Sequence, residues 1–116
     1  MRAAQLVAPR HWELIDLDKP QATGEHMLVR MEYVAICGSD KPPFVGVHES
    51  YPLAPGATGH EGMGVVESCP SGRYRAGDRV LLWGFDRGLF QEYVLAADAG
   101  GCILLPDHLP GEQVLM

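Results

Sequence analysis

The sequence has few cysteines and no long apolar run, and each absence excludes a class of protein. Its three cysteines are Cys37, Cys69 and Cys102, with no Cys-x-x-Cys pair, so neither a disulfide scaffold nor a closed four-cysteine zinc site is expected. No apolar stretch reaches the roughly 18 residues of a membrane-spanning helix, and the first residues, 1–5, are not followed by the apolar segment of a secretory signal. We expect a cytoplasmic protein with no membrane partner.

Positive charge is also scarce. The chain has nine basic and fifteen acidic residues, which gives a net charge of −6, and residues of neither sign form a block. A nucleic-acid partner is not expected, because binding phosphates needs a basic face. A length of 116 residues fits one domain with one hydrophobic core.

Glycine and proline are abundant and evenly spread, which breaks the chain into short segments typical of β-rich folds. The pattern predicts strands at 1–7, 11–17, 25–36, 62–67, 79–83, 89–96 and 102–105. Residues 40–59 are expected to form a surface loop stiffened by Pro42 and Pro43. A helix is expected to begin at Pro110. Since it has little room to bury its apolar residues, we interpret 1–116 as a fragment of a longer protein, with a frayed tail as the alternative.

Two short stretches contain the side chains most able to do chemistry. Cys37 offers a thiolate, His60 an imidazole and Glu61 a carboxylate, which are the donor types of a catalytic zinc. Only a chain that folds back can bring Cys37 and His60 together. From composition alone, a buried structural cysteine remains the alternative.

Four ordered runs give this pattern more weight. They are Cys37-Gly38-Ser39-Asp40, Gly59-His60-Glu61-Gly62-Met63-Gly64-Val65-Val66, Ala76-Gly77-Asp78-Arg79-Val80 and Phe90-Gln91-Glu92-Tyr93-Val94. Together they resemble the N-terminal catalytic domain of zinc-dependent medium-chain alcohol dehydrogenases, over nearly the whole chain. The resemblance implies a mainly β fold with short helices, a GroES-like partly open barrel.

The resemblance also implies a role for each polar residue in the first two runs. Cys37 and His60 would bind zinc, and Glu61 would be a third ligand or a carboxylate close by. Ser39 would place its hydroxyl beside the substrate oxygen, where it can accept a proton. Asp40 would hold the ring of His60. Without the resemblance, Ser39 and Asp40 are equally well explained as turn residues.

Departures from the family pattern define what else is expected. The four-cysteine lobe of many zinc members is absent, so one zinc site is expected. The Gly-x-Gly-x-x-Gly turn of a dinucleotide site is absent too, so NAD or NADP would be held by a nucleotide-binding domain outside these residues. A small alcohol or carbonyl substrate and a homo-oligomeric full-length protein are implied. Some members of the family continue the proton relay with a histidine shortly after the Ser-Asp pair, where this chain has Lys41, Pro42 and Pro43. His48 is a candidate substitute, but we expect it to be an exposed loop histidine.

Two other functions stay open. The same barrel serves assembly proteins, so a GroES-like binding or assembly module without catalysis is one alternative. A metal-free reductase of the same superfamily, such as a quinone reductase, is the other. It fits less well because such reductases lack the Cys37 and His60 pair.

Overall fold

The computed structural model describes residues 1–47, 50–84 and 88–115. The chain is mainly β with short helices, as predicted, and its described part contains no helix long and apolar enough to cross a membrane. The strands are β1 Arg2–Ala8, β2 His11–Asp16, β3 His26–Val34, β4 Glu61–Ser68, β5 Arg79–Trp83, β6 Tyr93–Ala97 and β7 Cys102–Leu104. The helices are η1 Gly38–Asp40, a 3-10 turn, α1 Lys41–Val45 and α2 Gly111–Val114.

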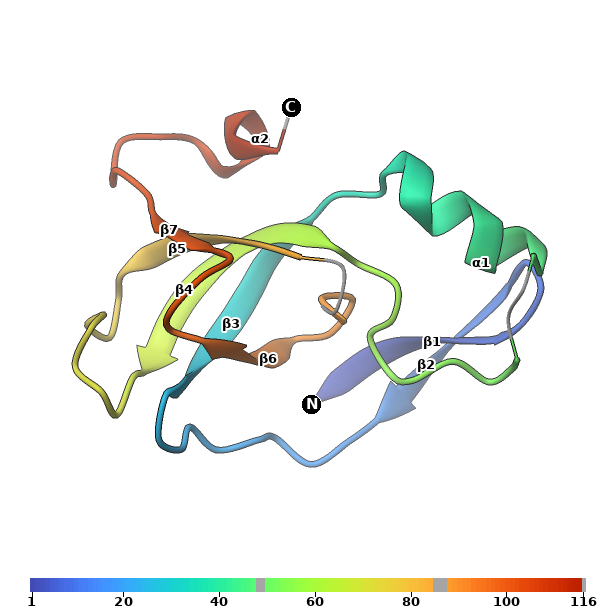
Figure 1. Cartoon of the computed structure of the whole chain (residues 1–116), viewed down its shortest axis with the longest axis horizontal. Helices are drawn as coiled ribbons and strands as arrows, with labels where there is room; N and C mark the ends of the chain where they lie inside the picture. The colour runs from blue at the N-terminus through green and yellow to red at the C-terminus, as the bar shows by residue number, and fades with distance from the viewer. Residues whose placement is uncertain (48–49, 85–87, 116) are drawn as a thin grey trace.

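The strands form two antiparallel sheets. β1 and β2 make a two-stranded ribbon, and the other five make a sheet of order β6-β3-β4-β5-β7. Figure 1 shows the ribbon beside the larger sheet, with α1 next to the ribbon and α2 above the part of the sheet that holds β5 and β7. The strands alternate in burial, as in β5, where Val80 and Leu82 are buried and their neighbours are not. The core consists of Met27, Val29, Val66, Val80, Leu82, Leu89, Val94 and Ala96.

The pairing of β3 with β4 determines where the polar residues of the first two motifs lie. Val34 at the end of β3 pairs with Gly62 near the start of β4, and the Ala35 N–H donates to the Glu61 carbonyl at 2.9 Å. The close approach of these strands needs glycine, because a Cβ at Gly64 would meet the Arg30 carbonyl oxygen at 2.3 Å. The chain leaves β3 and enters β4 at the same end of the sheet, which closes the long separation along the sequence.

Most expected strands are confirmed, and two expectations need correction. Residues 41–45 form a helix and not part of a loop. Pro42 and Pro43 stand in its first turn, where no backbone N–H is needed for an intrahelical bond, so they permit the helix. The expected strand 89–96 begins only at Tyr93. His48, named as a loop histidine, lies outside the described residues.

Candidate functional site

Three donor side chains meet at the end of the sheet where β3 and β4 pair. Cys37 follows β3, Asp40 ends η1, and His60 directly precedes β4. One donor atom from each of these residues lies within 4.8 Å of the others. Cys37 and His60 are 23 residues apart in the sequence (60 − 37). The pairing of β3 with β4 brings the thiol, the carboxylate and the imidazole together.

Asp40 is the buried centre of this cluster, with only 5% of its surface exposed. Its Oδ2 accepts the backbone N–H of Cys37 at 2.7 Å, and its Oδ1 accepts the hydroxyl of Thr58. The same Oδ1 lies 3.1 Å from Nδ1 of His60. A buried carboxylate is costly unless such partners compensate for lost water, so Asp40 is held in one place.

The Ser39 hydroxyl contacts both candidate metal ligands. Its Oγ lies 2.8 Å from Sγ of Cys37 and 3.1 Å from Nδ1 of His60. Ser39 is exposed, so its hydroxyl is also open to a ligand that approaches from outside. The structure thus places Ser39 next to Cys37 and His60, and its position beside a substrate oxygen stays a prediction.

The donor set fits a zinc ion. Nδ1 of His60 lies 3.1 Å from the Asp40 carboxylate, and a carboxylate contact of this kind commonly orients metal-binding imidazoles. The backbone of His60 is fixed as well, since its carbonyl accepts the N–H of Gly84 at 2.9 Å. Cys37 would supply a thiolate from the N-terminal end of η1.

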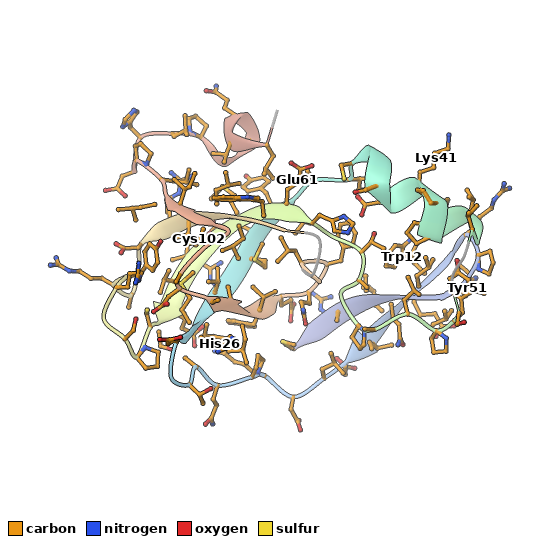
Figure 2. The ribbon with its side chains drawn as sticks, viewed as in Figure 1. Trp12, His26, Lys41, Tyr51, Glu61 and Cys102 are labelled. Atoms are coloured by element: carbon orange, nitrogen blue, oxygen red, sulfur yellow. The ribbon has the colours of Figure 1, made fainter. Side chains whose placement is uncertain are left out.

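Glu61 is placed differently from the other predicted residues. It is the first residue of β4, is half-buried, and is not one of the three residues in the cluster. Figure 2 shows Glu61 at the start of β4, near the segment where the chain leaves β3. Its role as a ligand stays a prediction.

A cavity of about 360 Å³ adjoins the cluster, and Cys37 and Asp40 form part of its wall. Two residues at this site were not singled out from the sequence. Thr58 holds Asp40 through its hydroxyl, and Trp12 reaches the cavity from β2. In the sequence, only the position of Thr58 two residues before His60 indicated that it could belong to the site. Nothing in the sequence indicated a role for Trp12, because its position at the cavity depends on how the β1–β2 ribbon packs.

The other two cysteines lie apart from this cluster. Burial works to raise the pKa of the Cys69 thiol, but hydrogen bonds from Ser71 and from the N–H groups of Tyr74 and Arg73 outweigh it and lower that pKa. Cys102 stands in β7, where its hydrogen bond with Tyr74 is the main reason that the pKa of that phenol rises to about 12. Cys37 is thus the cysteine of the metal-ligand cluster found among the described residues.

The antiparallel sheet, the short helices and the Cys37–Asp40–His60 cluster together define a GroES-like catalytic domain of the medium-chain dehydrogenase type. The chain belongs to the alcohol dehydrogenase GroES-like domain family, which matches residues 23–107, well over half of its length. The family resemblance and the fold predicted from the sequence are confirmed.

Individual relatives agree with this assignment. A D-arabitol-phosphate dehydrogenase of Enterococcus avium is 34% identical over 147 aligned residues, which cover 100% of this chain and 41% of the relative. The apo structure of zinc-dependent alcohol dehydrogenase 2 from Streptococcus pneumonia has a TM-score of 0.80 at 26% identity, over 99% of this chain and 41% of that one.

A quinone oxidoreductase is also similar. The quinone oxidoreductase of Thermus thermophilus, solved alone and with NADPH, has a TM-score of 0.74 at 27% identity, over 99% of this chain and 36% of that one. The chain spans about two fifths of the length of the curated relative described above.

Proposed function

We propose that this chain is the catalytic-domain portion of a zinc-dependent, NAD- or NADP-linked alcohol or polyol dehydrogenase. The observation that carries the proposal is the convergence of Cys37, Asp40 and His60 donor atoms within 4.8 Å, with the Ser39 hydroxyl in contact with two of these residues.

Each residue of the site has a defined task in this proposal. Cys37 and His60 hold the metal, and Glu61 is a third ligand or a neighbouring carboxylate. Asp40 orients the His60 ring through the contact at 3.1 Å. The Ser39 hydroxyl binds the substrate oxygen, accepts its proton and releases its own proton to the solvent to which it is exposed. When bound, zinc would act as a Lewis acid that stabilises negative charge on that oxygen.

The other half of the reaction belongs to the nicotinamide cofactor, which would accept or return the hydride. We assign its binding to a nucleotide-binding domain outside these residues. The proposal also includes one zinc ion per chain and a full-length enzyme that is homo-oligomeric and cytoplasmic. The 116-residue chain by itself would have no activity.

Cobalt substitution tests the metal site directly. Co²⁺ added to the chain should give a thiolate-to-metal charge-transfer absorption, and Cys37→Ser should abolish it. Cys69→Ser and Cys102→Ser are matched controls that should retain it, because both thiols lie apart from the cluster. With only Cys37 and His60 as firm ligands, weak binding is expected. An absorption that survives Cys37→Ser would contradict the proposal.

A metal-free reductase is a second candidate, favoured by the similarity to the quinone oxidoreductase. Full-length enzyme with Cys37→Ser separates the two functions. Loss of alcohol oxidation supports the zinc dehydrogenase, whereas quinone reduction with NADPH at an unchanged rate supports the reductase. A ring-shaped assembly without either activity would point to a GroES-like binding module.

A further inference from the structure

The cavity beside Cys37 and Asp40 has a wall made mainly of rings. Trp12, Phe44 and Phe90 line it, together with the aliphatic side chain of Ile36. Its volume of about 360 Å³ falls at the small end of ligand pockets, roughly 300–1,000 Å³. The polar groups of the metal-ligand cluster lie at one side of this space, so it has one polar end and an apolar body.

Two of the rings form a fixed pair. The Trp12 and Phe90 centroids lie 5.6 Å apart at an interplanar angle of 83°, an edge-to-face contact. The backbone of Phe90 is held on both sides, since its N–H donates to Gly56 at 3.0 Å and its carbonyl accepts from Ala4 at 2.8 Å. The wall is therefore a preformed surface and does not have to assemble around a ligand.

Apolar side chains near the cavity are also unusually exposed. Ile36 is 82% exposed and Phe44 is 36% exposed. Both flank the cluster, Ile36 directly before Cys37 and Phe44 in α1. Apolar surface of this kind gains free energy when a nonpolar group covers it.

The charge around the cavity does not suit a phosphate. Lys41 is the one cation among the described residues that line it. Figure 2 shows the Lys41 side chain extending outward from α1, away from Trp12. A phosphorylated polyol in this space would place its hydroxyls and phosphate against aromatic rings, where lost hydration is not replaced by hydrogen bonds.

We propose that this pocket selects alcohols or carbonyls with an apolar, ring-sized body, such as arylmethanols, and rejects phosphorylated polyols, with Trp12 as the residue that sets this preference. The inference rests on the proposed function, because that function places the reacting oxygen at the Cys37 and Ser39 end. It departs from the substrate in the name of the Enterococcus avium relative. Trp12 lies in β2, outside residues 23–107 that match the family.

The binding test uses the whole chain and NMR of its two tryptophan indole N–H groups. Benzyl alcohol should shift the Trp12 signal in a saturable way and leave Trp83, which is on β5, unmoved as an internal control. D-arabitol phosphate should shift neither. An unmoved Trp12 signal with benzyl alcohol, or a saturable shift with D-arabitol phosphate, would overturn the inference.

Substitution tests the role of Trp12. In the full-length enzyme, Trp12→Ala should lower kcat/KM for benzyl alcohol about three- to tenfold, the size of one lost aromatic contact, and Trp12→Phe should restore most of it. Equal values of kcat/KM for Trp12→Ala and the parent would contradict the inference.

Metal binding is measured separately. A cobalt absorption lost only in Cys37→Ser supports the proposed function even if benzyl alcohol does not bind. A Trp12 shift without any cobalt absorption upholds the pocket while the metal function fails.

Discussion

Asp40 Oδ1 lies 3.1 Å from Nδ1 of His60, and the other oxygen of the same carboxylate accepts the N–H of Cys37 at 2.7 Å. One buried side chain thus contacts both residues that we propose as zinc ligands. The site depends on Asp40 for its geometry even if Asp40 never touches the metal.

Asp40→Asn should weaken cobalt or zinc binding about 10- to 100-fold, because an uncharged amide holds the His60 ring less firmly than the carboxylate that contacts Nδ1. Competition with a chromogenic chelator measures the affinity. Asp78→Asn is a matched control: Asp78 Oδ2 accepts the N–H of Arg75, three residues earlier, at 2.8 Å, as Asp40 does for Cys37, but is not in the cluster. Equal affinities of the two variants would contradict the role of Asp40.

Gly56→Ala should destabilise the fold by about 2–4 kcal/mol, because strain at positive φ adds to overpacking. Gly56 has φ +80°, and a Cβ there would meet the Gly88 carbonyl oxygen at 2.4 Å. Gly72 has φ +75° with open space around it, so Gly72→Ala should cost only about 1 kcal/mol. Urea unfolding of both variants measures the difference, and similar losses would show that the close contact relaxes.

Tyr74 should make stability depend on alkaline pH. Its hydrogen bond with Cys102, aided by burial, raises its pKa to about 12. An unfolded tyrosine loses its proton near pH 10, so between these values the folded state binds more protons than the unfolded one. The contribution is complete below about pH 10 and is lost as pH rises toward 12.

Two measurements check this. A tyrosinate absorbance titration should show a phenol that ionises late, and Tyr74→Phe should remove that phase. Unfolding of the same variant should lose part of its slope with pH in this window. If Tyr74→Phe left the late titration in place, another residue would be its source.

Arg79 should hold the C-terminal segment to β5. Its Nη1 donates to the carbonyls of Pro106 at 3.2 Å, Asp107 at 3.1 Å and Leu109 at 2.6 Å. Arg79→Lys keeps the charge but not this geometry, so it should cost about 1–3 kcal/mol and speed amide exchange over residues 109–114. Arg30→Lys is the control, because its ion pair with Glu32 is exposed. Equal stability and equal amide exchange in the two variants would contradict this role of Arg79.

The sequence was most informative where a local signal decides the structure. β5 was predicted with its observed bounds, because Asp78 marks a turn and Val80 and Leu82 alternate with exposed neighbours. Cys37, Ser39, Asp40 and His60 were identified from short motifs, and the structure places them together.

Features that depend on contacts between distant parts of the sequence could not be predicted. No local rule tells that β3 pairs with β4 in a register that joins Val34 to Gly62, yet this register brings the cluster together. The position of Trp12 beside Phe90 likewise depends on how a separate ribbon packs. The helix 41–45 was missed because two prolines were taken to oppose regular structure, whereas the first helical turn accepts them.

The ribbon β1–β2 carries Trp12, whereas Cys37 and His60 belong to the ends of the larger sheet. The ribbon joins the rest of the chain through the Arg2–Glu92 ion pair and through backbone hydrogen bonds such as those from Ala4 to Phe90 and from Leu53 to Leu6. Under the preference that we propose, a new side chain at position 12 would change which molecule the cavity accepts and leave the residues proposed to hold the metal in place. Substrate choice and metal binding would then be separable by mutation.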